Sequence, residues 1–214
     1  MRVGILGSGL MGGKIGTIFA RAGHDVLFSY ARTRKKLEGL ARNAGGSARA
    51  GSPRQAAQHG EVVLLAVHWS RVDDVLSQAG NLSGKLVITC TLPMNAADTK
   101  LVLGNTTSGA EAVAARLPRA DVVAAFQTVP SEVLFGVFDA RAKATRPSLV
   151  YCGGKRSGKR VAATLIDDVG FDPVDAGPLR IARYMEPFAL LMAQLAYGGK
   201  GGPELAYRFP RFGS

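Results

Sequence analysis

A glycine-rich turn between an apolar run and an amphipathic stretch constrains this chain more than any other feature. The apolar run Val3 to Leu6 leads into Gly7-Ser8-Gly9-Leu10-Met11-Gly12. Small and apolar residues then recur at helical spacing (Ile15, Ile18, Phe19, Ala22) until Gly23. The pattern predicts a strand, a tight turn and a helix.

Each glycine of this turn has a physical role if a dinucleotide binds there. Gly7 would permit the tight turn, Gly9 would let the backbone approach a pyrophosphate, and Gly12 would let the helix pack on the strand. The helix N-terminus would offer free N–H groups and a positive dipole end to the phosphates. An isolated glycine pattern also fits an ordinary turn, but the strand before it and the helix after it favour a nucleotide site.

The end of the second expected strand, 25–29, indicates which nucleotide binds. NAD enzymes usually place Asp or Glu there to bind the ribose 2′-hydroxyl, whereas this chain reads Ser29-Tyr30-Ala31-Arg32-Thr33-Arg34-Lys35. Ser29 can donate to a 2′-phosphate, and Arg32 with Arg34 or Lys35 can pair with it. The alternative is a solvated first helical turn, but cations at a helix start oppose its dipole. We therefore expect NADP rather than NAD.

The rest of the chain alternates strand and helix signals. We expect strands at 47–50, 61–67, 85–91, 121–126, 148–152 and 171–175, and helices at 33–44, 71–79, 108–117, 155–169 and 178–197, with one more helix that starts at Ser52-Pro53. This predicts an α/β fold, a doubly wound Rossmann-type, mostly parallel sheet with a small C-terminal α/β addition. We place a dinucleotide-binding domain at 1–145 and the addition, which completes an acceptor pocket, at 146–214. The segment 127–146 reads as a long loop of the kind that forms lids.

Composition limits the partners and the location. The net charge is +11, but the cations are scattered, so we expect anionic cofactors rather than nucleic acid as partners. Cys90 and Cys152 lie far apart in apolar runs, which indicates buried thiols and neither a disulfide framework nor a metal site. The chain has no apolar run long enough for a membrane span and no room for a signal peptide before its first strand. We expect a cytoplasmic protein.

Several stretches together resemble a known family. They are GSGLMGGKIG, SYAR, LLAVHWSRV, VITCTLPMN, AAFQTVPSEVLF, VDAGPLRIARYMEP and the terminal GGKGGPELAYRF. Spread over the whole chain in this order, they resemble the NADP oxidoreductases dependent on coenzyme F-420, an 8-hydroxy-5-deazaflavin. They also resemble the cytosolic reductase domain of the six-transmembrane metalloreductases.

The resemblance implies the site residues. Those expected to bind the cofactor are Gly7, Ser8, Gly9, Leu10, Met11, Gly12, Ser29, Tyr30, Arg32, Arg34, Lys35, Ala66, Val67, His68, Leu92 and Pro93. Those expected at the acceptor pocket are Gln127, Gly201 and Gly202. The deazaflavin enzymes carry His where this chain has Gln127, and the metalloreductases commonly carry Asn, so an amide is compatible with a flavin acceptor.

The resemblance also implies the chemistry. Hydride would pass between NADP(H) and a stacked FMN, FAD or deazaflavin ring, so that no protein acid or base is required. We therefore expect no catalytic side chain, no metal and, by analogy, a homodimer. Tyr151 and Lys155 match a Tyr-x-x-x-Lys pair, but the glycines between them make one helical face improbable. We expect His24 and His59 to be structural or solvated, and Arg183 and Glu186 to pair within one helix.

Three other functions remain open at this point. An NADPH-binding redox sensor without turnover would keep the nucleotide site and lose the acceptor. A dehydrogenase of the β-hydroxyacid or imino-acid type shares the N-terminal half but needs a larger helical C-terminal domain. DNA binding through the +11 charge is disfavoured because no helix concentrates the cations.

Overall fold

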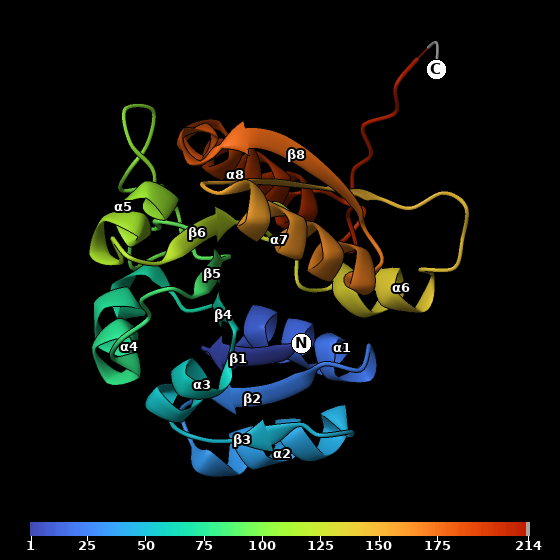
Figure 1. Ribbon diagram of the computed structural model, residues 1–214. Helices are drawn as coiled ribbons and strands as arrows, with labels where there is room; N and C mark the ends of the chain where they lie inside the picture. The colour runs from blue at the N-terminus through green and yellow to red at the C-terminus, as the bar shows by residue number, and fades with distance from the viewer. Residues whose placement is uncertain (213–214) are drawn as a thin grey trace.

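The computed structural model describes residues 1–212, which form one eight-stranded sheet covered by helices on both faces (Figure 1). The strands are β1 (Arg2–Leu6), β2 (Asp25–Ser29), β3 (Arg49–Ala50), β4 (Val62–Leu65), β5 (Leu86–Thr89), β6 (Asp121–Ala124), β7 (Ser148–Gly153) and β8 (Asp172–Pro178). The helices are α1 (Leu10–Arg21), α2 (Arg34–Ala44), α3 (Pro53–His59), α4 (Val72–Ala79), α5 (Gly109–Arg116), α6 (Val133–Asp139), α7 (Arg156–Val169) and α8 (Ala182–Gly198).

The strand order is β3-β2-β1-β4-β5-β6-β7-β8. All neighbouring pairs are parallel except β6 with β7. The order reverses between β1 and β4, which is the topological switch point where open α/β sheets bind ligands. The fold prediction is confirmed, and β7 and β8 extend the same sheet across the boundary that we place at 145/146. That domain boundary stays a prediction.

Alternate residues of the strands supply two apolar cores, one on each face. Val3 and Ile5 of β1 face the core beneath α1, α2, α6 and α7. Leu6 and the β4 residues Val63 and Leu65 face the core beneath α3 and α4. Because both faces are covered, the strands read as continuous apolar runs rather than as alternating ones.

One expected loop contains a helix. The segment 127–146, which we predict to be a long lid-like loop, forms α6 over Val133–Asp139, and that prediction is wrong. The helix is short, contains Gly136 and has no side-chain cap, so it carries none of the usual start and stop signals. It packs against α1 and α7, and this tertiary packing stabilises a segment of weak intrinsic propensity.

The last helix is attached to α5 by charged residues, which do not form the intrahelical pair that we expect. Arg183 donates to both carboxylate oxygens of Glu111 in α5, at 2.7 and 2.8 Å. Glu186 accepts from the backbone N–H groups of Gly109 and Ala110, at 2.9 and 3.0 Å. The predicted pairing of Arg183 with Glu186 is therefore wrong, because each side chain reaches the start of α5 instead.

The remaining sequence expectations concern burial and membranes. Cys90 and Cys152 are both buried free thiols, as predicted. His24 and His59 bond to Asp168 and to the backbone of Asp25, which are structural roles. Within residues 1–212, none of the helices combines the length and the apolar character that crossing a membrane requires.

Candidate functional site

The turn between β1 and α1 has the geometry that its glycines predict. Gly7 has a positive φ of 110°, and a Cβ there would lie 2.3 Å from the Ala66 carbonyl oxygen of β4's carboxyl end. A Cβ at Gly12 would lie 1.9 Å from the Gly7 carbonyl oxygen, so α1 packs directly on the turn. A Cβ at Gly9 would meet nothing within 4 Å. The protein itself does not fill the space beside Gly9, which leaves room for a ligand's approach.

The start of α1 presents unpaired backbone donors to this space. The Ser8 N–H donates to Tyr30, and its hydroxyl donates to the Ser29 carbonyl, so Ser8 fixes the turn rather than facing a ligand. Gly9 is the N-cap of α1 and has no side chain with which to satisfy the first turn. The N–H groups of the first turn, at Leu10 and Met11, therefore remain available to an anion.

A cleft of about 580 Å³ opens over this helix start, and we call it the phosphate cleft. Its walls come from the carboxyl ends of β1, β2 and β4. The lining residues are Gly7, Ser8, Gly9, Leu10, Tyr30, Ala31, Arg32, Lys36, Ala66, Val67, His68 and Arg71. Three of them are cations, Arg32, Lys36 and Arg71, which approach from two different connections. This arrangement suits a ligand that carries phosphates at both ends of a sugar.

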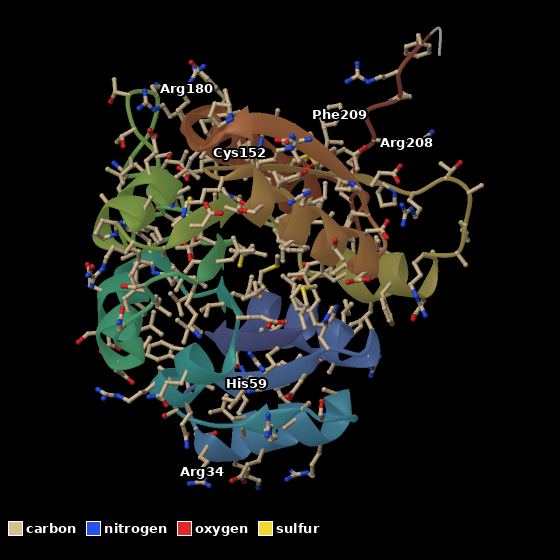
Figure 2. The ribbon with its side chains drawn as sticks, viewed as in Figure 1. Arg34, His59, Cys152, Arg180, Arg208 and Phe209 are labelled. Carbon is tan, nitrogen blue, oxygen red and sulfur yellow. The ribbon has the colours of Figure 1, made fainter. Side chains whose placement is uncertain are left out.

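Three residues predicted to bind the 2′-phosphate do not line the phosphate cleft in this structure. Ser29 is fully buried, and its hydroxyl donates to the Ile5 carbonyl at 2.6 Å, so it cannot donate to a ligand in this arrangement. Arg34 pairs with Glu38 at 2.9 Å, and Figure 2 shows it on the outer side of α2, pointing away from the molecule. Lys35 does not line the phosphate cleft, whereas its neighbour Lys36 does.

Two further residues of the cleft are held by acidic partners. The Tyr30 hydroxyl donates to Asp74, and burial followed by this hydrogen bond raises the pKa of Tyr30 to about 12. His68 lies with Nδ1 2.8 Å from the Ser70 hydroxyl and Nε2 3.1 Å from Asp98. Both rings are thus oriented at the carboxyl ends of β2 and β4, where we predict cofactor contacts.

A second cavity, of about 230 Å³, lies beside α8, and we call it the α8 cavity. Its lining is mostly apolar and comes from α1, the connections after β5 and β6, and α8. The residues are Leu10, Met11, Cys90, Leu92, Phe126, Gln127, Thr128, Val129, Pro130, Ser131, Ala189, Met192, Ala193 and Tyr197. Leu10, which is 70% exposed, lines both this cavity and the phosphate cleft. An extended ligand can therefore run from one to the other across the start of α1.

Gln127 is the unsatisfied polar group of the α8 cavity. Its side chain is 7% exposed, and neither the amide oxygen nor the amide nitrogen has a hydrogen-bond partner within residues 1–212. Phe126, directly before it, adopts a positive φ of 72°, which is unusual for a bulky residue and typical of strained functional loops. A buried amide without partners costs free energy unless a ligand supplies them.

Two groups of predicted residues fall outside these cavities. Pro93 is buried against Gly109, so Leu92 alone of this pair faces the α8 cavity. The tail glycines Gly201 and Gly202 line neither cavity, and their place at the acceptor pocket stays a prediction. The tail reaches the site through Tyr207 instead, because its hydroxyl bonds to Thr128 at 2.7 Å.

A polar cluster borders the opening of the α8 cavity, and sequence reasoning missed it. Lys14 of α1 donates to the Ser131 carbonyl at 3.0 Å and to the Ser131 hydroxyl at 3.3 Å. Ser131 and Tyr197 both donate to Glu132, at 3.2 and 2.9 Å. These residues come from three distant parts of the sequence, and only the folding of α1, α6 and α8 around one cavity brings them together.

The side chains of the site do not form a metal centre. Among residues 1–212 there is no group of three or more His, Cys, Asp or Glu side chains arranged to hold a metal ion. Burial raises the pKa of the Cys90 thiol to about 12, so this cavity residue is an inert neutral thiol at physiological pH.

Comparison with known proteins agrees with this geometry. Residues 2–93 match the family model "NADP oxidoreductase coenzyme F420-dependent". The chain is 28% identical over 189 residues to metalloreductase STEAP3 of Rattus norvegicus, which covers 88% of this chain and 36% of the relative. The chain thus spans about a third of the length of the curated relative that it matches.

Two solved structures share the fold. One, from Arthrobacter sp. FB24 and described as an F420-dependent NADP-reductase, superimposes with a TM-score of 0.85 at 24% identity, covering 99% of this chain and all of the other. A reductive aminase from Aspergillus terreus in complex with NADPH gives a TM-score of 0.66 at 20% identity, covering 92% and 61%. The family match over residues 2–93 confirms the resemblance to the F420-dependent NADP oxidoreductases that the sequence motifs indicate.

Proposed function

We propose that this protein is an NADPH-dependent oxidoreductase that transfers hydride to a flavin or deazaflavin bound in the α8 cavity. The observation that carries the proposal is Gln127, a buried amide whose two polar atoms have no hydrogen-bond partner among residues 1–212. It lies in an apolar cavity that shares Leu10 with the phosphate cleft. The proposed nucleotide site and the proposed acceptor site would therefore meet at the start of α1.

The residues of the phosphate cleft fit NADPH. The pyrophosphate would lie at the open face of Gly9, where the first-turn N–H groups of α1 and the helix dipole favour an anion. Arg32 and Lys36 would bind the 2′-phosphate, with Arg71 facing them from the connection after β4. The nicotinamide end would then extend across Leu10 toward Leu92 and the α8 cavity.

The unpartnered amide of Gln127 indicates the kind of acceptor. One atom of this amide accepts and the other donates, so the complementary ligand edge carries a carbonyl next to an N–H. The pyrimidine ring of flavins and deazaflavins has such an edge. The cavity around Gln127 is mostly apolar, which suits the flat remainder of such a ring.

The protein's contribution to the reaction would be to orient the two rings and to exclude water from the space around them. NADPH, a substrate that is consumed, supplies a hydride from C4 of its nicotinamide. Leu10 and Met11 would hold the donor ring against the acceptor, and Ala189 and Met192 of α8 would exclude water from the opposite side. Holding two rings in contact replaces a bimolecular encounter and supplies a large part of the rate enhancement.

The test is NADPH oxidation measured against a panel of FMN, FAD, riboflavin, deazaflavin, a ferric chelate and a cyclic imine. We expect flavins to be reduced faster than the deazaflavin, because Gln127 cannot supply the positive charge of a His. Gln127→Ala should lower acceptor reduction about tenfold, the cost of roughly one lost hydrogen bond, with NADPH affinity unchanged. Ser83→Ala, at the opposite end of the sheet, is the matched control.

Each alternative function gives a different result in this assay. Loss of NADPH binding in Gln127→Ala would place Gln127 in the nucleotide site. Turnover of the imine alone would favour the imino-acid type of dehydrogenase. An inactive wild type and an inactive Gln127→His variant, both binding NADPH, would favour the sensor.

The homodimer and the cytoplasmic location belong to this proposal too. Supporting the dimer, α8 exposes Tyr184, Leu191 and Leu195, each more than half accessible, along one outer face beside the cavity. An apolar face of this kind is typical of subunit interfaces. Light scattering after size-exclusion chromatography should give twice the mass of the chain, and Leu191→Lys with Leu195→Lys should give the monomer.

A further inference from the structure

Reduction of the acceptor in the α8 cavity requires a proton as well as a hydride. This inference rests on the proposed function. A ring that gains a hydride gains negative charge, and the mostly apolar cavity would penalise that charge. The proton must come from water or from a side chain that lines the cavity.

Most of the cavity's exchangeable protons are poorly suited to this task. The Cys90 thiol donates to the Leu65 carbonyl, at 3.6 Å, so its proton is already engaged by the backbone. The Tyr197 hydroxyl donates to Glu132, and no Lys or Arg is hydrogen-bonded to it among the described residues to resupply a proton. The Thr128 hydroxyl is shared with the buried Tyr207 hydroxyl, and no cation contacts either group among the described residues.

Ser131 is different, because a cation donates directly to its hydroxyl. The residue is 5% exposed and lines the α8 cavity. Lys14 Nζ lies 3.3 Å from its Oγ and 3.0 Å from its carbonyl oxygen, so the lysine is held in place by two bonds. Lys14 itself is half-buried and keeps access to solvent for its own proton exchange.

The geometry points to Ser131 as the proton donor to the acceptor, with Lys14 as the residue that positions Ser131 and returns its proton. The acceptor gains a hydride, with its two electrons, from NADPH, which leaves as NADP⁺. The Ser131 O–H bond breaks as a new bond to the acceptor's heteroatom forms, and an N–H proton of Lys14 moves to Ser131 Oγ. Solvent then reprotonates the neutral Lys14 amine.

Glu132 makes this transfer possible without leaving a charge unpaired. Ser131 donates to Glu132 at rest, and rotation about one bond turns its hydrogen toward the cavity. Tyr197 also donates to the same carboxylate oxygen, at 2.9 Å, so Glu132 keeps a partner while Ser131 is turned away. Burial acts against it, but the bonds from Tyr197 and Ser131 and the nearby Lys14 charge keep the pKa of Glu132 below its usual value. Glu132 therefore stays an acceptor and does not compete as an acid.

The test compares single variants in NADPH-dependent reduction of FMN, or of the panel acceptor that the wild type reduces fastest. Ser131→Ala and Lys14→Ala should each lower kcat about 100-fold, the lower end of the contribution of a positioned acid. The NADPH Kd should stay within threefold of the wild-type value. Lys85→Ala is the matched control, because Lys85 also donates to backbone carbonyls, at Gln58 and Gly60, but at the other end of the sheet.

Two measurements distinguish proton transfer by Lys14 from a purely structural contact with Ser131. Lys14→Arg keeps the charge and the bonds to Ser131, but a guanidinium does not give up its proton, so its kcat should stay low. Added primary ammonium ions should restore the activity of Lys14→Ala, and the restored rate should rise with the acidity of the ion. A rescue that is independent of acidity, or full activity in Lys14→Arg, would overturn the proton role.

The outcomes also separate this inference from the proposed function. A wild type that reduces no acceptor would overturn both. An active wild type whose Ser131→Ala variant keeps the wild-type kcat would overturn the inference alone. A Lys14→Ala variant with unchanged kcat and a tenfold weaker NADPH Kd would make Lys14 a nucleotide ligand instead.

Discussion

The Glu186 carboxylate of α8 lies 2.9 Å from the backbone nitrogen of Gly109, at the first turn of α5. It is fully buried, and its other oxygen accepts from Ala110 at 3.0 Å. A helix N-terminus favours an anion, so Glu186 attaches α8, which forms a wall of the α8 cavity, to the start of α5. Leu92, which precedes α5 in the chain, lines the same cavity. The contact between Glu186 and Gly109 thereby links α8 to the segment that follows Leu92.

This contact predicts a specific pH dependence of stability. Burial raises the pKa of Glu186 from 4.5 to about 7, despite the two N–H bonds that lower it. The folded state then holds a proton more tightly than the unfolded state, so this contribution is complete below pH 4.5 and is lost as pH rises through about 7. The loss amounts to about 3 kcal/mol, and Glu186→Gln should abolish it.

Thermal unfolding followed between pH 4.5 and 8 checks this prediction. The exposed residue Glu204 provides the matched control, and Glu204→Gln should follow the wild-type pH profile. An identical pH profile in wild type and Glu186→Gln would mean that other groups determine the dependence.

The neighbouring arginines Arg32 and Arg34 should differ sharply in nucleotide preference. Arg32 lines the phosphate cleft, whereas Arg34 lies outside it and pairs with Glu38. We expect wild type to bind NADPH at least tenfold more tightly than NADH, about 1.4 kcal/mol. Arg32→Glu should reverse this preference, because a carboxylate repels the 2′-phosphate and accepts from a 2′-hydroxyl. Arg34→Glu should leave it unchanged.

Calorimetric titration of both nucleotides into both variants makes the comparison. Equal effects of the two substitutions would mean that net charge, and not a defined 2′-phosphate site, controls affinity. Lys36→Ala should weaken NADPH alone.

Alanine substitutions at Gly9 and Gly12 should have different effects, the first on NADPH affinity and the second on stability. A Cβ at Gly9 meets nothing within 4 Å, whereas a Cβ at Gly12 meets the Gly7 carbonyl oxygen at 1.9 Å. Gly9→Ala should therefore fold with a nearly unchanged Tm but bind NADPH at least tenfold more weakly. Gly12→Ala should lower the free energy of unfolding by about 2 kcal/mol. Denaturant unfolding and NADPH titration on both variants test this, and wild-type affinity in Gly9→Ala would remove the pyrophosphate from this turn.

Local patterns in the sequence predicted the fold well, for physical reasons. The apolar run Val62–Leu65 and the turn Gly7–Gly12 depend on interactions between near neighbours, which spacing reveals. The end of β2 shows the limit of such patterns. Ser29 stands where a ligand-binding residue is expected, but burial of both sheet faces turns its hydroxyl to Ile5.

Long-range contacts account for what sequence reasoning missed. Arg71 joins Arg32 only because β2 and β4 flank β1 in the sheet. Likewise, Glu186 reaches Gly109 from 77 residues away, while the short spacing to Arg183 favoured a local ion pair. The Gln127 amide has no hydrogen-bond partner among the described residues. No sequence pattern can predict that such a partner is missing.

The last prediction concerns Tyr207, which attaches the tail to the site. Its hydroxyl bonds to Thr128 at 2.7 Å and accepts from the Val150 backbone N–H at 3.0 Å. Tyr207→Phe would leave both groups without this partner, and a buried unsatisfied polar group costs about 1–3 kcal/mol. We therefore expect the free energy of unfolding to fall by about 2 kcal/mol. Tyr184→Phe, at an exposed tyrosine of α8, should have no measurable effect.

The same substitution should change acceptor kinetics, because Thr128 directly follows Gln127 and lines the α8 cavity. Without the Tyr207 hydroxyl, the Thr128 hydroxyl is free to bond to the Gln127 amide. It would then compete with the acceptor for that amide. The KM for the acceptor should rise severalfold while the NADPH Kd stays unchanged, measured by steady-state kinetics and titration. If stability falls but the acceptor KM does not change, Tyr207 anchors the tail without influencing the site.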